Sequence, residues 1–174
     1  MRPSDPVIRP AASDDLDAVA AIFSDYITSS VVTFEVTPPK EEDWRRACDD
    51  LAARGLPFLI CGCGGGAAGY AYAAPRRAKP AYRHTVESTI YLAPGPHRPA
   101  TWPSVVPRAA AALRARRRGA HDCSHGRRWR SDVDSAASRM RFTDAGRLRN
   151  VGRKHGRLIG TLLMQHDLTA EGAG

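Results

Sequence analysis

The sequence contains no run of 18 apolar residues, although a helix needs about 20 of them to span a bilayer. Residues 1–10 also lack the apolar core that a secretory signal peptide requires. These two absences exclude the usual signatures of membrane insertion and of export. We therefore expect a cytoplasmic protein that has no membrane partner.

Cysteine is also scarce. The four residues are Cys48, Cys61, Cys63 and Cys123. Their spacing matches no disulfide framework, so we expect reduced, structural thiols. His121, Cys123 and His125 alternate in a way that resembles metal-ligand spacing. Because zinc sites use four ligands and no distant fourth accompanies these three, we expect no metal ion.

Core-forming residues are missing from one long window of the chain. Residues 95–141 contain no lysine, isoleucine or phenylalanine, and a single leucine, Leu113. They hold eleven arginines against three aspartates, which accounts for the whole net charge of +8. The rest of the chain is balanced, with fifteen basic and fifteen acidic residues. Residues 95–139 are therefore atypical and poorly suited to form a core.

The remaining composition, with 43% hydrophobic residues overall, fits one domain of ordinary size. We expect this domain to cover residues 1–168, followed by a tail over residues 169–174. Residues 7–9 predict a strand, and two amphipathic helices follow. The first helix has Ser13 as its N-cap and apolar residues at helical spacing from Leu16 to Ile27; the second covers residues 41–54 and stops at Gly55.

Strands dominate the rest of the pattern. They are predicted at residues 58–61, 68–72, 85–92 and 159–165. Glycines at residues 64–66 suit the turn between the first two of these strands. Order returns near residues 140–142, and no internal repeat is present.

Glu87 is the most informative single residue. It stands between Val86 and Ile90 in an apolar strand, where a carboxylate is costly unless it is paired or useful. A catalytic role and a solvated edge-strand position both fit this spacing. The preceding loop is basic, with Arg76, Arg77, Lys79, Arg83 and His84. It suits either a substrate that bears a carboxylate or simple solvation.

Five short segments form a characteristic set when taken in order and spacing. They read IRPA (8–11), TFE (33–35), GYAYA (69–73), AYRHTVESTIYLAP (81–94) and VGRKHGR (151–157). This set resembles the phosphinothricin and methionine-sulfoximine N-acetyltransferases of the GNAT superfamily. The motifs Y-x-x-T-V-E-S-T-I-Y-L and V-G-x-K-H-G are specific to that branch, and the resemblance covers most of the chain outside residues 95–139.

The resemblance implies an α/β fold, the GNAT (acyl-CoA N-acyltransferase) fold, with a central mixed sheet flanked by helices. The fourth and fifth strands of this sheet splay apart to admit the pantetheine arm of acetyl-CoA. The implied activity is transfer of acetyl from acetyl-CoA to the amino group of a small amino-acid-like substrate. Phosphinothricin or methionine sulfoximine is the implied substrate type, and a homodimer is the implied assembly.

The resemblance also assigns roles to individual residues. Glu87 would accept a proton from the substrate ammonium, so that a neutral amine attacks the thioester. The backbone of Ile90, Tyr91 and Leu92 would pair with the pantetheine amides and polarise the thioester carbonyl. The implied substrate contacts are Phe34, Arg77, Lys79, Tyr82, Ser88 and Thr89. Phe34 suits the core as well as it suits a pocket wall.

The sequence departs from the family directly after residue 94. There the family has a glycine-rich loop at a helix N-terminus, whose backbone amides bind the cofactor pyrophosphate. Arg98 corresponds to the start of that loop, but no glycine follows it until Gly119, and prolines interrupt the segment.

Two explanations of the departure stay open: a shifted reading frame over residues 95–139, or a divergent segment. Trp102 and Pro103 favour the shifted frame, because TGG followed by CC yields a glycine codon one base further on.

Two other functions remain as alternatives. The arginine-rich segments 114–118 and 127–130 would suit a nucleic-acid-binding protein, since arginines near an aromatic ring bind phosphates and bases. Confinement of the excess charge to a window without lysine argues against a selected nucleic-acid surface. The chain could also be an inactive pseudo-enzyme that lacks the phosphate-binding loop.

Overall fold

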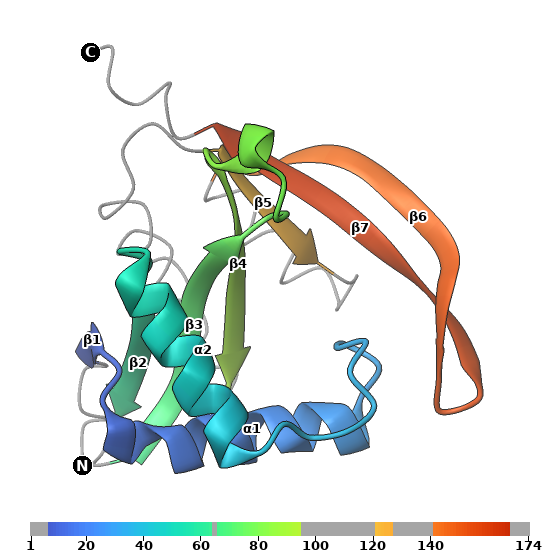
Figure 1. The fold of residues 1–174 in the computed structure, drawn as a ribbon. Helices are drawn as coiled ribbons and strands as arrows, with labels where there is room; N and C mark the ends of the chain where they lie inside the picture. The colour runs from blue at the N-terminus through green and yellow to red at the C-terminus, as the bar shows by residue number, and fades with distance from the viewer. Residues whose placement is uncertain (1–6, 64–65, 95–120, 127–140, 168–174) are drawn as a thin grey trace.

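The computed structural model describes residues 7–63, 66–94, 121–126 and 141–167. The helices are η1 (Ser13–Asp15), α1 (Leu16–Ser29), α2 (Glu41–Ala53) and η2 (Pro80–Tyr82). The strands are β1 (Val7–Pro10), β2 (Phe58–Cys63), β3 (Gly66–Pro75), β4 (Thr85–Leu92), β5 (His121–Gly126), β6 (Thr143–Lys154) and β7 (Arg157–Asp167). Figure 1 shows their arrangement.

All seven strands join one sheet in the order β1-β2-β3-β4-β5-β7-β6. Neighbouring strands are antiparallel except β4 and β5, which are parallel. The sheet is therefore mixed, as expected, and the predicted α/β class is confirmed. Since β4 and β5 run in the same direction, the pair that they form separates the antiparallel strands β1–β4 from the antiparallel strands β5–β7.

An aromatic cluster attaches α1 and α2 to the sheet. Trp44 of α2 lies 5.4 Å, ring centroid to ring centroid, from Phe23 of α1 and 5.8 Å from Tyr70 of β3. Tyr91 of β4 lies edge-on to Phe23 at 5.1 Å. Edge-to-face packing of this kind adds to the roughly 1.5–3 kcal/mol that each large apolar side chain contributes when fully buried. The cluster fixes the position of β4 relative to both helices.

The predicted N-cap at Ser13 is wrong. Ser13 is the first residue of η1, and α1 begins at Leu16 without a side-chain cap. The carboxylate of Asp15 instead accepts two hydrogen bonds from Arg9, at 2.6 and 2.7 Å, and one from the Ala12 backbone N–H at 2.8 Å. Because Asp15 is held by Arg9 of β1, the chain makes one 3₁₀ turn before the α-helix starts.

Strands β6 and β7 form a long hairpin that curves away from the rest of the sheet toward the end of α1 (Figure 1). We call this hairpin the arm. Its turn places His155 at φ 48° and Gly156 at φ 72°, the two positive φ angles of a type I′ turn. The arm confirms the strand predicted at residues 159–165, and β6 was not predicted. No helix among the described residues is long and apolar enough to cross a membrane.

Candidate functional site

Strands β4 and β5 pair over only two positions and then part. Thr85 faces His121 and Val86 faces Asp122, and the pairing between these strands ends there. Beyond Val86, β4 continues to Leu92 with its other edge paired to β3 throughout. The opposite edge of β4 therefore borders a fork between the two strands, and Glu87 is the first residue beyond its apex.

Hydrogen bonds at both ends of the β3–β4 ladder show which backbone groups face the fork. The Ala93 N–H donates to the Ala68 carbonyl at 2.8 Å, and the Arg76 N–H donates to the Thr85 carbonyl at 3.1 Å. Strand residues alternate in the edge to which their N–H and C=O point. The peptide groups of Ile90 and Leu92 consequently point toward the fork.

The same alternation turns the peptide groups of Tyr91 toward its partner Tyr70 on β3. Of the three backbone positions predicted for the pantetheine, two face the fork and Tyr91 faces away from it. The Tyr91 side chain packs against α1, where its ring lies 4.8 Å from that of Tyr26.

The side chain of Glu87 is ion-paired. Arg76, the residue that follows β3, contacts Glu87 Oε1 through its Nη1. The two side chains are 18% and 30% exposed respectively, so the pair is shielded from solvent but still accessible. Arg76 was recognised in the sequence only as one member of a basic loop. No sequence pattern showed that it contacts Glu87, because the contact depends on the register of β3 against β4.

Tyr72 and Tyr91 lie on the same face of the sheet as Glu87. Tyr72 is hydrogen-bonded to Thr89, and burial, followed by the negative charges of Glu87 and Glu35, raises the pKa of Tyr72. Burial also raises the pKa of Tyr91 to about 12, although its hydrogen bond to Thr33 opposes this change. Both phenols therefore stay protonated at neutral pH.

The hydrogen bond between Tyr91 and Thr33 connects the segment after α1 to β4. Lys154 of the arm, only 4% exposed, donates to the Thr33 carbonyl at 3.0 Å. His155 Nε2 lies 3.1 Å from the Ile27 carbonyl and donates to it. The arm thus contacts residues 27–34 at Ile27 and Thr33.

Phe34, which the sequence left between core and pocket wall, is 46% exposed and therefore lies outside the core. Its ring covers Gly152 of β6 so closely that a Cβ on Gly152 would overlap it. Glycine is needed there for close approach, and the contact was not evident from the V-G-x-K-H-G motif.

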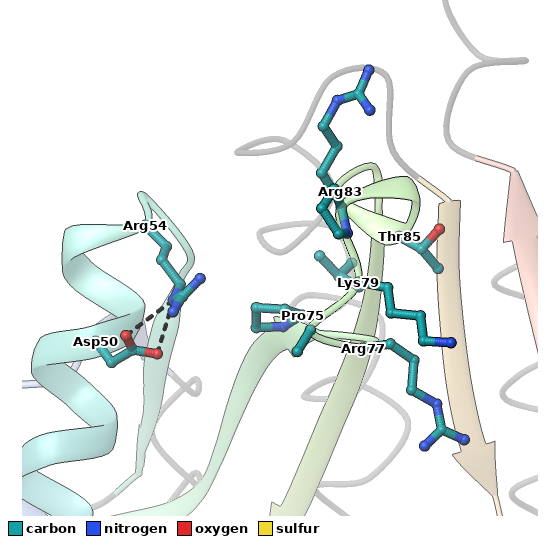
Figure 2. A pocket seen from close by; sticks show the side chains of 10 residues that line it. Asp50, Arg54, Pro75, Arg77, Lys79, Arg83 and Thr85 are labelled. Carbon is teal, nitrogen blue, oxygen red and sulfur yellow. Dashed lines mark hydrogen bonds and ion pairs between the residues drawn. The ribbon is translucent and has the colours of Figure 1, made fainter.

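A cavity of about 420 Å³ opens between the end of α2 and the loop after β3 (Figure 2). Arg54, Arg77, Lys79 and Arg83 line it together with Asp50, which is bonded to Arg54 at 2.9 Å. The wall is therefore strongly basic. Figure 2 shows Arg77 and Lys79 extending to the same side of the loop.

The predicted substrate residues do not all meet in this cavity. Arg77 and Lys79 line it, whereas Glu87 does not. Ser88 and Thr89 are half-buried on β4, and Tyr82 ends η2 with 42% of its surface exposed. Arg98, predicted for the pyrophosphate loop, lies outside the described residues, as does most of the window 95–139.

Solved structures define the class of this fold. A GNAT-superfamily phosphinothricin acetyltransferase from Sinorhizobium meliloti, in complex with acetyl-CoA, matches with a TM-score of 0.86 and 25% identity over 98% of this chain and 92% of that chain. A ribosomal-protein-alanine N-acetyltransferase from Brucella melitensis matches with a TM-score of 0.81 and 24% identity over 92% of this chain and 99% of the other. The fold is that of the GNAT acetyltransferases.

A curated relative narrows the class. The phosphinothricin N-acetyltransferase of Alcaligenes faecalis is 34% identical over 94% of this chain and 83% of its own length. No protein-family model matches the chain. The chain belongs to the phosphinothricin N-acetyltransferase family within the GNAT superfamily, and it is an N-acetyltransferase by that membership.

Proposed function

We propose that this chain transfers acetyl from acetyl-CoA to the amino group of a small amino acid of the phosphinothricin or methionine-sulfoximine type. The observation that carries the proposal is the position of Glu87, directly beyond the last paired residue of β4 and β5. A carboxylate at the apex of an open fork lies beside any group that the fork admits. The names of the relatives supply the substrate type.

The described residues fit the pantetheine part of acetyl-CoA. The peptide groups of Ile90 and Leu92 point toward the fork. Pantetheine carries two amides, which can add to a strand edge as another strand would. Acetyl-CoA would supply an activated thioester carbonyl there. The residues that would bind its pyrophosphate fall outside the described segments.

Glu87 accepts the proton of the substrate ammonium, directly or through one water, and leaves a neutral amine. Ser88 and Thr89, together with Arg77 and Lys79 of the basic loop, orient the rest of the amino acid. Phe34 and Tyr82, both partly exposed, form walls beside the substrate. Tyr72 is hydrogen-bonded to Thr89 and fixes the face of the sheet on which the substrate lies.

The test is release of the CoA thiol from acetyl-CoA in the presence of L-phosphinothricin or L-methionine sulfoximine. We expect turnover with at least one of them, and a kcat roughly 10²- to 10⁴-fold lower for Glu87→Gln. Glu41→Gln is the matched control, because Glu41 is an exposed residue of α2 that pairs with Arg45. Absence of turnover and of acetyl-CoA binding in the unaltered chain would contradict the proposal.

A parallel assay of a version with the reading frame corrected over residues 95–139 addresses the pyrophosphate loop. If the chain as written is weak and the corrected version is fast, the described half of the site is competent and the window limits it. If both are equally fast, a glycine-rich loop is dispensable here.

We also propose that the active form is a homodimer. β6 is a twelve-residue strand at the edge of the described sheet, exposed along most of its length, and a long sheet edge is a ready surface for another chain. Leu148, Val151 and Leu158 of the arm are each about half exposed, at 48%, 51% and 58%. Sedimentation of the wild type against Leu148→Glu tests this, with a dimer expected only for the wild type.

A further inference from the structure

Arg76 is fixed beside the proposed base by the backbone and not only by its own side chain. It extends the β3–β4 ladder by one residue beyond the Pro75–Val86 pair, and its N–H donates to the Thr85 carbonyl at 3.1 Å. Its guanidinium contacts Glu87 Oε1. The guanidinium of Arg76 is therefore held in contact with the carboxylate that is proposed to deprotonate the amine.

An arginine in contact with the base is not needed for an enzyme that acetylates a simple amine. It places a positive charge where an incoming ammonium must come. Holding two half-buried charges together also has a desolvation cost. A substrate that carries only an ammonium would meet this charge unfavourably. A substrate that brings its own negative charge next to the ammonium would not.

An α-amino acid is such a substrate, because its ammonium and carboxylate are attached to the same carbon. When the ammonium lies on Glu87, the α-carboxylate falls beside the partner of Glu87. A guanidinium has five N–H donors in a planar fork suited to carboxylates, so one guanidinium can contact two carboxylates at once. The substrate ammonium then lies against the Glu87 carboxylate, and the substrate carboxylate lies against the Arg76 guanidinium.

We propose that Arg76 binds the α-carboxylate of the amino acid whose ammonium Glu87 receives, and that this pair selects α-amino acids over simple amines. The inference rests on the proposed acetyl transfer. It assigns different tasks to the basic residues. Arg76 holds the carboxylate next to the reacting amine. Arg77 and Lys79 line a cavity to which Glu87 does not contribute, and they contact the distant end of the substrate.

The test compares an amino acid with its own methyl ester, which keeps the amine and loses the negative charge. For the wild type we expect kcat/KM to favour L-methionine sulfoximine over its ester. In Arg76→Gln we expect kcat/KM for the acid to fall about 10- to 100-fold, mainly through KM, while the ester changes little. Arg76→Lys keeps the charge and should recover part of the preference.

Arg45→Gln is the control for lost charge, because Arg45 is an exposed residue of α2 bonded to Glu41. It should leave the preference for the acid unchanged. Circular dichroism of each variant checks that the fold is kept.

Calorimetric titration of the acid and the ester into the protein tests the same preference without turnover. An inactive chain would therefore count against the proposed function while still testing Arg76. A wild type that binds acid and ester equally overturns the inference. So does an Arg76→Gln variant that loses kcat equally for both, because Arg76 would then only position Glu87.

Discussion

The contact between Gly152 and Phe34 predicts a stability change that depends on a second residue. A Cβ built on Gly152 lies 2.7 Å from Phe34 Cδ1, closer still to Cε1, and 3.2 Å from Ile159 Cγ1. Overfilling a packed contact costs about 1–3 kcal/mol. Because Phe34 is 46% exposed and can turn toward solvent, we expect Gly152→Ala to destabilise the protein by about 1 kcal/mol.

The same substitution should be harmless when Phe34 is replaced by alanine. Gly152 does not have a positive φ, so alanine suits its backbone. Alanine also restricts the unfolded chain, which stabilises by about 0.4–1 kcal/mol. In the Phe34→Ala background we therefore expect Gly152→Ala to be neutral or slightly stabilising, with a coupling of about 1–2 kcal/mol between the two sites. The contact with Ile159 is present in both backgrounds, so its cost cancels from the coupling energy.

Urea unfolding of the four proteins measures this coupling, since each kilocalorie moves the midpoint by about 0.3–1 M. Gly156→Ala is the internal control. Gly156 has φ +72°, and no atom beyond its own residue and its two chain neighbours lies within 4 Å of the position that a Cβ would take. Its cost of about 1 kcal/mol therefore comes from the backbone alone. That cost should be equal in both backgrounds. An equal loss for Gly152→Ala in both would refute the steric account.

Three further changes have defined outcomes. The hydrogen bond from Arg9 lowers the pKa of Asp15, so its stabilisation is complete above the unfolded value of 3.8 and is lost as pH falls through the lower folded value. Asp15→Asn should therefore be about 0.5–1 kcal/mol less stable at pH 7, and thermal unfolding should show this difference narrowing as the pH falls below 3.8. Gly69→Ala would place a Cβ 2.6 Å from the Tyr91 carbonyl oxygen and should cost about 3 kcal/mol in urea unfolding; an unchanged midpoint would contradict the close approach of β3 to β4. Burial raises the pKa of Cys48, so peptide mapping should find its alkylation at pH 8 slower than that of free cysteine.

The sequence was sufficient to predict the helices and strands that bury one face of apolar side chains. α1 and α2 repeat their apolar residues at helical spacing, and β2, β3 and β4 consist of apolar and aromatic runs. The resemblance to the GNAT branch was sufficient for the fold class and the family. Both kinds of information depend on side chains, either through periodicity or through motif identity.

Elements held by backbone pairing alone were not predicted. β6 is exposed at nearly every position and shows no alternation, so its residues give no sign of a strand. Its order comes from the ladder with β7 and from the turn at His155 and Gly156. The Arg76–Glu87 pair escaped prediction for a related reason, since two residues eleven apart meet only when the register of two strands is known.

The parallel join between β4 and β5 has a consequence for how the protein is held together. The described strands form two antiparallel groups, β1–β4 and β5–β7. Among these strands, the two groups are joined by backbone pairing at only two positions, Thr85 with His121 and Val86 with Asp122. If acetyl-CoA lies along the fork as proposed, it would add contacts between the two groups, because it would bond to β4 and pack against β5. Acetyl-CoA at a hundred times its Kd would stabilise the fold by about 2.7 kcal/mol. The backbone amides of β5 should then exchange with solvent more slowly with acetyl-CoA bound than without it. The co-substrate would stabilise the sheet as well as take part in the reaction.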